Sequence, residues 1–240
     1  MSVMIVAEAG STHDNSLDKA LRLIRCAKDC GADAIKLQVC TNIDKLMAKR
    51  GEKPEARPAY EYLKTTKDWL PRLKEEAVKV GIQFGCTAFI PEDIPLVAQY
   101  VDFFKVAAKE SGDAAFMDAH FKYGKPLIAS ERDGHEAHWN LSMNVKVMYC
   151  VSEYPTPIEH LKLHRIWQKY DGFSDHSTST LTGALAVMLA GKDAVIEKHI
   201  RLWDTETFNP DFPHSMICEP TAVYSFAEYV SNCRHASRCL

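Results

Sequence analysis

The chain has 240 residues, of which 46% are hydrophobic and 25% charged, and its formal net charge is −3 at pH 7. This composition is typical of a globular protein with ample material for a core. The small charge gives no basis for binding nucleic acid or an acidic membrane surface, and no run approaches the roughly 18 apolar residues that span a membrane. The first residues lack a basic leader and enter an apolar pattern at once, so we expect no cleaved signal and a cytoplasmic location.

Short apolar runs alternate with segments of helical spacing along the whole chain. Strands are predicted at residues 4–10, 34–39, 82–89, 101–108, 126–130, 145–151, 172–176 and 194–200. Helices are predicted at residues 16–31, 68–81, 91–100, 112–123, 157–170, 180–191 and near 221–236. Residues 40–67 and 134–144 lack either pattern, and the first of these is predicted as a long loop that is functional or mobile.

This alternation predicts a parallel sheet covered by helices, and eight strand–helix repeats in about 250 residues fit a (β/α)8 TIM barrel. We therefore expect a single α/β domain over residues 1–240. A doubly wound open sheet is the alternative, but residues 8–13 lack the Gly-rich phosphate loop of that architecture. In a barrel, the active site lies at the carboxyl ends of the strands.

Two strand ends near the C-terminus carry the residue types of a metal site. Ser174 and His176 are two residues apart, as are Glu197 and His199, so each pair shares one face of its strand. The two strands flank one predicted helix in a βαβ unit, which brings their ends into one crevice. Neutral imidazole is a common ligand for a divalent transition metal, and two imidazoles leave positions open for substrate. The alternative is that each histidine is an ordinary hydrogen-bonded residue at a strand end.

Nearly every other strand also ends in polar residues. In chain order they are Glu8; Lys36 and Gln38; Thr87; Lys105, Lys109 and Glu110; Ser130, Glu131 and Arg132; and Ser152 and Tyr154. Strands covered by helices should read as continuous apolar runs, so these residues need partners or a charged ligand. Lys36 could instead form an internal salt bridge with Glu8. Thr87 and Ser152 could be ordinary strand-end hydroxyls, and Lys109 could be solvated at the rim.

Five segments, spread over most of the chain, form specific motifs. They are Ile-Val-Ala-Glu-Ala-Gly at 5–10, Gly-Ala-Asp-Ala-Ile-Lys-Leu-Gln at 31–38, Cys-Val-Ser-Glu-Tyr-Pro-Thr-Pro at 150–157, Phe-Ser-Asp-His-Ser at 173–177 and Val-Ile-Glu-Lys-His at 195–199. In these motifs and their order, the chain resembles the barrel domain of the sialic acid synthase family. Members of this family are phosphoenolpyruvate-dependent enzymes that make N-acetylneuraminate and related nonulosonic acids.

The resemblance implies a role for each matching residue. It makes His176 and His199 the ligands of a divalent metal, Mn2+ or Mg2+. It places phosphoenolpyruvate on Lys36, Thr87, Lys105, Ser130 and Ser174, with Ser152 near its phosphate. It places Glu8, Gln38, Glu110, Tyr154, Glu197 and Asp211 near the sugar or the reacting centre, with Glu8 or Glu197 as the candidate for proton transfer. Two lysines and several hydroxyl donors are suitable ligands for phosphoenolpyruvate, which is a trianion. A metal that acts as a Lewis acid would activate the aldehyde of the sugar for attack by a carbon nucleophile.

The sequence also departs from the family pattern. Lys-Ile-Gly-Ser-Gly-Glu becomes Lys-Val-Ala-Ala-Lys-Glu at 105–110, Ser-Thr-Gly-Met becomes Ser-Glu-Arg-Asp at 130–133, and Gly-Pro-Asp-His becomes Asn-Pro-Asp-Phe at 209–212. The chain stops after the last predicted helix, so we expect the family's C-terminal antifreeze-like domain, which lends an arginine to the partner subunit's sugar site, to be absent. We therefore expect Arg132 or the loop at 40–67 to replace that arginine, and an acceptor other than free N-acetylmannosamine. Pairing of Arg132 with Glu131 or Asp133 in solvent is the alternative. Homo-oligomerisation, and a separate protein that supplies the domain, stay open.

The sequence thus predicts a metal-dependent synthase that condenses phosphoenolpyruvate with an aldose to give a nonulosonic or other 2-keto-3-deoxy acid and phosphate. A metal-dependent barrel aldolase or isomerase that uses no phosphoenolpyruvate is one alternative, but it leaves Lys36, Lys105 and the hydroxyl groups unexplained. The other is a binding barrel without catalysis. The altered polar clusters favour that alternative, whereas the retention of both histidines and both glutamates opposes it.

Overall fold

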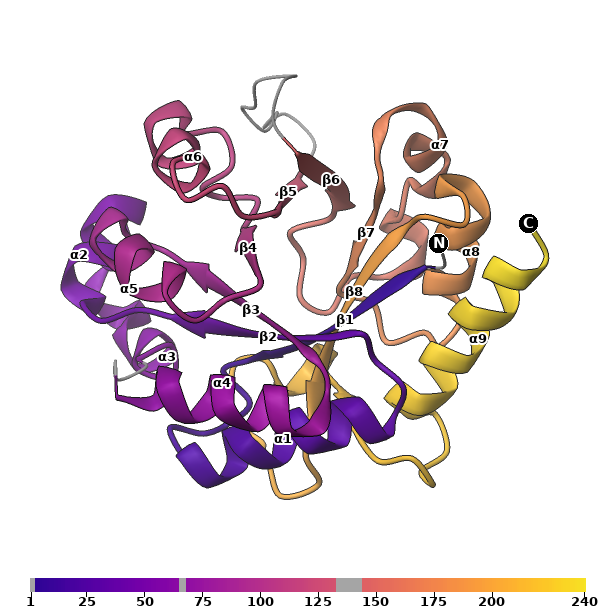
Figure 1. Ribbon diagram of the computed structural model, residues 1–240, viewed down its shortest axis with the longest axis horizontal. Coiled ribbons are helices and arrows are strands. Elements are labelled where there is room, and N and C mark those ends of the chain that lie inside the picture. Colours follow the sequence, from indigo (N-terminus) through magenta and orange to yellow (C-terminus); the bar gives the residue numbers. More distant parts are fainter. Residues whose placement is uncertain (1–2, 65–67, 133–143) are drawn as a thin grey trace.

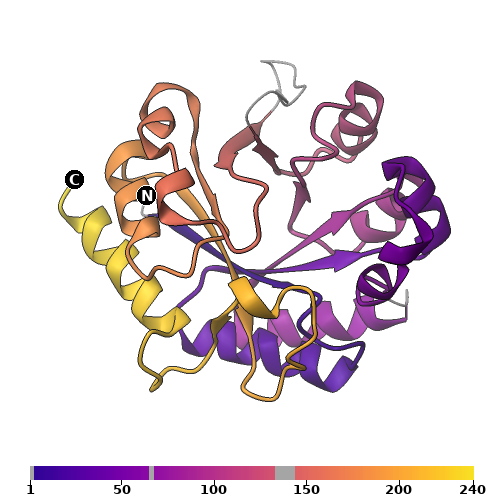
Figure 2. The same ribbon diagram turned by 180° about the vertical axis from the view of Figure 1, so that it is seen from behind.

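The computed structural model describes residues 3–64, 68–132 and 144–240, and its strands form a closed parallel barrel surrounded by helices (Figures 1 and 2). The strands are β1 (Met4–Gly10), β2 (Ala34–Val39), β3 (Gln83–Ala88), β4 (Phe103–Val106), β5 (Leu127–Glu131), β6 (Val145–Cys150), β7 (Gly172–Asp175) and β8 (Val195–Arg201). Each strand pairs in parallel with the next, and β1 also pairs with β8, which closes the ring. A short β9 (Met216–Ile217) pairs with the end of β8. The predicted (β/α)8 barrel is confirmed.

The helices that follow the strands form the outer layer of the molecule. They are α1 (Leu17–Asp29), α4 (Trp69–Val80), α5 (Ile94–Ala98), α6 (Ala114–Phe121), α7 (Ile166–Lys169), α8 (Thr182–Ala190) and α9 (Phe226–Arg238). Ser16 caps α1 as its residue type predicts, because its hydroxyl accepts a hydrogen bond from the Lys19 backbone N–H. In Figure 1, α1 lies beside α4 and α9 lies beside α8. In the described part of the chain, no helix is long and apolar enough to cross a membrane.

Two predictions about local structure were wrong. The segment 157–170 is not one helix but two 3-10 turns, Ile158–His160 and Leu163–Arg165, followed by the short α7. The segment 40–67 is not an irregular loop, because it contains α2 (Ile43–Arg50), a 3-10 turn at Pro54–Ala56 and α3 (Arg57–Glu61). The predicted connection at 134–144 lies, except for its last residue, outside the described residues.

The helices of segment 40–67 owe their stability to local caps and to a small core of their own. The Asn42 side chain accepts a hydrogen bond from the Lys45 N–H at 3.0 Å, and Gly51 ends α2 in the left-handed conformation with φ of 64°. The buried residues of this second core are Cys40, Ile43, Leu46, Met47, Tyr60, Phe89 and Ile90. Since Phe89 and Ile90 follow β3, the segment packs over the carboxyl ends of the strands.

The barrel interior is apolar at one end and polar at the other. Toward the amino ends of the strands, one cluster contains Val6, Ala34, Phe103, Ile128, Met148 and Val195. Along each strand, the next residue on the same face is two positions later. Val6 is therefore followed by Glu8, Ala34 by Lys36, and Val195 by Glu197, all buried. This alternation places the charged residues directly above the apolar cluster, at the carboxyl end of the barrel.

Candidate active site

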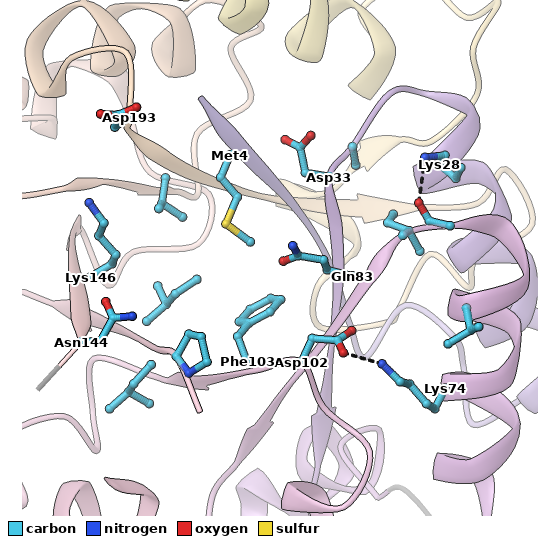
Figure 3. Close-up of a pocket in the computed structure, with 18 residues that line it drawn as sticks. Met4, Lys28, Asp33, Lys74, Gln83, Asp102, Phe103, Asn144, Lys146 and Asp193 are labelled. Carbon is cyan, nitrogen blue, oxygen red and sulfur yellow. Dashed lines mark hydrogen bonds and ion pairs between the residues drawn. The ribbon is translucent and has the colours of Figure 1, made fainter. Parts of the chain in front are cut away.

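The barrel has a hollow at each end, and the two differ in chemistry. The larger, with a volume of about 1010 Å³, opens at the amino ends of the strands; Met4 and Phe103 line it, and Lys74 pairs with Asp102 at 2.6 Å at its edge (Figure 3). The other, of about 530 Å³, lies at the carboxyl ends, and we call it the carboxyl-end cavity. Its walls include Gln38, Arg132, Ser152, Tyr154, His199, Asp211 and His214. Barrel enzymes place their chemistry at the carboxyl ends of the strands, so this cavity is the candidate site.

A buried cluster of four charged residues lies in the barrel interior at the carboxyl end. The Lys36 ammonium forms an ion pair with Glu8 and lies 3.5 Å from Glu197 Oε2. The Lys105 ammonium lies 3.7 Å from Glu197 Oε1, so Glu197 is shared by both lysines. Gln38, which lines the cavity, donates to Glu8 Oε1 at 3.3 Å and connects the cluster to the cavity wall. The internal Lys36–Glu8 salt bridge considered from the sequence is present, but as part of this larger cluster.

Three hydroxyl groups complete the cluster. Lys36 Nζ donates to Thr87 Oγ1 at 3.2 Å, and Lys105 Nζ donates to Ser130 Oγ at 2.8 Å. Ser174 Oγ donates to Glu197 Oε1 at 2.8 Å. All these groups are almost fully buried, and burial of charge is costly unless the charges are paired or serve a ligand. With two lysines and two carboxylates, the cluster is balanced in charge.

The environment lowers the pKa values of both Lys36 and Glu197, which favours the neutral form of the lysine and the charged form of the glutamate. Burial lowers the pKa of Lys36 to about 8; the Glu197 carboxylate opposes this shift and the Lys105 charge adds to it. Burial alone would raise the pKa of Glu197, but Lys105, Lys36 and the Ser174 hydrogen bond outweigh it and lower that pKa to about 2. Glu197 is therefore an anion at neutral pH. Lys36 loses its proton more readily than an exposed lysine would.

The two histidines predicted as metal ligands lie next to one another above this cluster. The ring centroids of His176 and His199 are 5.4 Å apart. His176 Nδ1 lies 2.8 Å from the Val151 carbonyl oxygen, to which it can donate, and this leaves Nε2 available as a ligand atom. Burial lowers the pKa of His176 to about 4 and that of His199 well below its ordinary value, so both imidazoles are neutral at pH 7. His199 Nδ1 is buried without a hydrogen-bond partner among the described residues. His176 Nε2 lies 3.5 Å from Ser174 Oγ, whose proton goes to Glu197, so it keeps its lone pair. Neutral imidazoles with available lone pairs fit a divalent metal.

The remaining predicted site residues lie around the cavity. The Tyr154 ring packs on His176 with 4.2 Å between centroids, and Tyr154 is half exposed. Ser152 and Arg132 form part of the wall, and Asp211 Oδ2 lies 4.0 Å from His199 Nδ1. Glu110 is buried behind the wall, where its Oε1 accepts from Arg50 Nε at 2.8 Å. The structure thus brings together the predicted strand-end residues, except Glu110 and those described next.

Two residues expected at a charged rim lie elsewhere or are already paired. Glu131 is not at the rim, because it points out of the barrel, is buried, and accepts hydrogen bonds from Lys169 at 2.6 Å and Tyr170 at 2.7 Å. Its neighbour Ser130 points inward, as the alternation of a strand requires. Lys109 lines the cavity and is half exposed, with its ammonium 3.3 Å from Glu52. Asp133, the other suggested partner of Arg132, lies outside the described residues.

Two residues of the cavity wall, His214 and Arg50, were not predicted as site residues from the sequence. His214 lines the cavity, and its ring centroid is 4.5 Å from that of His199 and 5.1 Å from that of Tyr154. The signal was present in the sequence, where the expected Asp-His pair is replaced by Asp211 with a histidine three residues later. Arg50, from α2, reaches the cavity wall and stacks over Phe89, with 4.7 Å between guanidinium carbon and ring centroid. Its place follows from helices that the sequence pattern did not indicate.

A second buried network fixes β7 and β8 from outside the barrel. Asp175 and Lys198 alternate with the site residues and point outward, where their side chains lie 3.2 Å apart. The Asp175 carboxylate also accepts from Thr182 Oγ1 at 2.5 Å and from Tyr229 OH at 3.0 Å. Lys198 also donates to the Ser177 carbonyl oxygen. Because His176 and His199 are the sequence neighbours of this pair, the network holds the imidazoles in place.

The fold and the site define a (β/α)8-barrel protein with a charged cluster and neutral imidazoles at the carboxyl ends of its strands. The chain belongs to the NeuB family, whose model matches residues 23–239. It is 34% identical over 226 residues to the pseudaminic acid synthase of Campylobacter jejuni, covering 83% of this chain and 65% of the relative. It is 29% identical over 262 residues to human N-acetylneuraminate-9-phosphate synthase, covering 98% and 70% respectively. The chain therefore spans about two thirds of the length of these relatives.

A solved structure agrees with the sequence comparisons. The sialic acid synthetase of Leptospira borgpetersenii, crystallised with citrate, superposes with a TM-score of 0.83 and 26% identity, covering all of this chain and 85% of that one. The resemblance to the sialic acid synthase family is thereby confirmed. The relatives are named as synthases of sugar acids, which act in carbohydrate biosynthesis.

Proposed function

We propose that this protein condenses phosphoenolpyruvate with an aldehyde sugar to form a 2-keto-3-deoxy sugar acid and inorganic phosphate. The observation that carries the proposal is the buried cluster in which Lys36 and Lys105 share Glu197 beneath the imidazoles. Membership of the NeuB family and the names of the relatives support it. A barrel without catalysis would gain nothing from burying two ammonium groups, whereas a trianionic substrate needs them.

The two lysines and the hydroxyl groups are the groups that would hold phosphoenolpyruvate. Lys36, Lys105, Thr87, Ser130 and Ser174 already form a connected set of hydrogen bonds. A phosphate or carboxylate oxygen that enters this set replaces a glutamate oxygen as the partner of an ammonium group. Because the cluster is balanced in charge before the substrate arrives, an added cation should favour entry of the anion. We therefore expect phosphoenolpyruvate and the divalent metal to bind cooperatively.

The reaction balances with one water molecule. C3 of phosphoenolpyruvate bonds to the aldehyde carbon, the hydroxyl of water bonds to C2, and the bond between C2 and the phosphate oxygen breaks. One proton of the water goes to the former aldehyde oxygen and the other leaves with phosphate. We assign these proton transfers to the carboxylate of Glu8 or of Glu197, because both belong to the buried cluster. A divalent metal at His176 and His199 would supply Lewis-acid polarisation of the aldehyde oxygen.

The acceptor sugar is proposed to lie in the carboxyl-end cavity, with Arg132 as one of its contacts. Arg132 is partly buried in the wall, and its Nε has no hydrogen-bond partner among the described residues. Gln38, Tyr154 and Asp211 line the same cavity. A guanidinium suits an acceptor that carries a carboxylate, phosphate or acylamino oxygen. We therefore propose that the preferred acceptor differs from free N-acetylmannosamine.

The proposal is tested by turnover with a position-specific isotope label. The Mn2+-loaded protein is incubated with phosphoenolpyruvate that carries 18O between C2 and phosphorus, and with a panel of amino sugars and their phosphates. Phosphate should appear only when an acceptor is present, and it should carry the label. Lys105→Met should abolish turnover, whereas the exposed Lys192→Met should not. Release of no phosphate with any aldose from folded, metal-loaded protein would refute the proposal.

A simpler measurement separates this function from barrel chemistry without phosphoenolpyruvate. A ligand that binds the native state raises its apparent stability. Phosphoenolpyruvate should therefore raise the melting temperature of the wild type but not of Lys105→Met. For the acceptor, Arg132→Ala should change the ranking of acceptors by KM, while Arg22→Ala, at a surface pair with Asp204, should not. An unchanged ranking, or N-acetylmannosamine as the best acceptor, would remove the role of Arg132.

A further inference from the structure

We infer that His214, together with Asp211 and His199, forms a three-residue divalent cation site, so that the ligands of the metal include side chains outside the two histidine motifs. The inference rests on the proposed function for the presence of a cation at this end of the barrel. It concerns which side chains bind that cation, and it can be tested without turnover.

The distances between the three side chains suit one shared ion. Asp211 Oδ1 lies 3.5 Å from His214 Nε2, and Asp211 Oδ2 lies 4.0 Å from His199 Nδ1. One ligand atom from each residue can be chosen so that all lie within 4.8 Å of one another. Nitrogen and oxygen ligands lie about 2.0–2.2 Å from such an ion, so two of them can be at most about 4.4 Å apart. The two distances to Asp211 meet this limit. Small rotations of the imidazole rings would bring the distance between His199 and His214 within it as well.

The ring nitrogens at this site lack other partners. His199 and His214 are 6% and 2% exposed, yet His199 Nδ1 and both ring nitrogens of His214 have no hydrogen-bond partner among the described residues. An unsatisfied buried polar atom costs about 1–3 kcal/mol, so such atoms call for an explanation. The carboxylate of Asp211 is near both rings but too far for a good hydrogen bond. An ion bound between the two rings and the Asp211 carboxylate would give these nitrogens a partner. It would also explain why the carboxylate and the rings are too far apart for hydrogen bonds.

The carboxylate of Asp211 is held in place by groups that are not themselves ligands. Its Oδ2 accepts from the Ser11 backbone N–H at 2.7 Å and from Ser11 Oγ at 2.8 Å. Gly10, which has φ of 51°, leaves the space for it, because a Cβ there would lie 2.2 Å from that oxygen. Ligand carboxylates in metal sites are oriented in this way. His214 ends the 3-10 turn Phe212–His214 that follows Asp211, and residues three apart lie on one side of such a turn.

The donor set also indicates which cation this site prefers. Two imidazoles and one carboxylate are typical ligands of Mn2+, Fe2+, Co2+ or Zn2+, whereas Mg2+ prefers oxygen alone. His176 lies beside the three residues, with its ring centroid 6.2 Å from that of His214, and it does not belong to the set within 4.8 Å. The site therefore predicts tighter binding of Mn2+ than of Mg2+, with His214 contributing directly.

The test measures metal binding directly. Chelator-treated protein is titrated with Mn2+ while the electron paramagnetic resonance signal of the free ion is followed. The wild type should bind Mn2+ more tightly than Mg2+, as measured by competition. His214→Gln and Asp211→Asn should each weaken Mn2+ binding by at least about tenfold. His120→Gln, at a buried histidine on α6, is the matched control and should bind as the wild type does.

A spectroscopic measurement keeps the inference testable if a variant folds poorly. In the wild type, pulsed spectra of bound Mn2+ should show nitrogen from at least two imidazoles, and folded His214→Gln should lose one of them. Mn2+ binding of unchanged affinity by folded His214→Gln would overturn the inference even if the enzyme condenses phosphoenolpyruvate. Binding that depends on His214 without any turnover would instead leave the inference standing and remove the proposed function. Absence of Mn2+ binding by the wild type would overturn the inference as well.

Discussion

The buried pair behind the active site gives the sharpest prediction about stability. Lys198 and Asp175 are both fully buried and 3.2 Å apart, and Tyr229 of α9 contacts both of them. Lys198→Met keeps the length of the side chain but removes its charge, which leaves the Asp175 carboxylate buried without a cation. Breaking a buried pair in this way costs about 3–5 kcal/mol. Asp175 keeps its hydrogen bonds from Thr182 and Tyr229, so we expect the lower part of that range, about 3 kcal/mol.

The assay is urea unfolding of the variants at pH 7, followed by circular dichroism. The free energy of unfolding of Lys198→Met should fall by about 3 kcal/mol, whereas that of the exposed Lys192→Met should change by less than about 0.5 kcal/mol. Adding Asp175→Asn to Lys198→Met should restore part of the loss, because no unpaired charge then remains. A loss below about 1 kcal/mol in Lys198→Met would refute this reasoning. So would a double variant whose loss equals the sum of the two single losses.

Three further outcomes are expected. Burial lowers the pKa of His120 to about 4, so the unfolded state binds the proton first as the pH falls. His120 should therefore contribute a drop of about 1.6 kcal/mol in the free energy of unfolding between pH 6.5 and 5, and His120→Gln should remove that part of the slope while exposed His235→Gln does not. Gly10→Ala should lower stability by at least about 1 kcal/mol and weaken Mn2+ binding, because its Cβ would displace Asp211; a variant that binds normally would contradict this. Chelation should reduce the affinity for phosphoenolpyruvate, measured by calorimetry, and an unchanged affinity would disprove the proposed cooperativity.

The sequence determined the barrel because strand periodicity and helix caps act locally. The strands at 4–10 and 34–39 have the predicted bounds, and Ser16 caps α1 as expected. The alternation of side chains along β7 and β8 was also enough to place Ser174 with Glu197 inside the barrel. Motifs at the strand ends then indicated the family, since polar residues in a buried strand are there for a ligand or for one another.

Only the tertiary structure decided which partner each polar group has. The segment 40–67 shows why, because α2 and α3 are too short to be stable alone and form where they can pack over the end of β3. The sequence places Glu131 at the rim of the barrel. In the structure its side chain points outward and accepts hydrogen bonds from Lys169 and Tyr170. His214 has no strand periodicity to locate it, so its place beside His199 depends on how the chain returns over the barrel after β8. Distances between residues far apart in sequence arise from packing. The local pattern could therefore indicate the strands and their polar ends, but not the full set of residues that meet there.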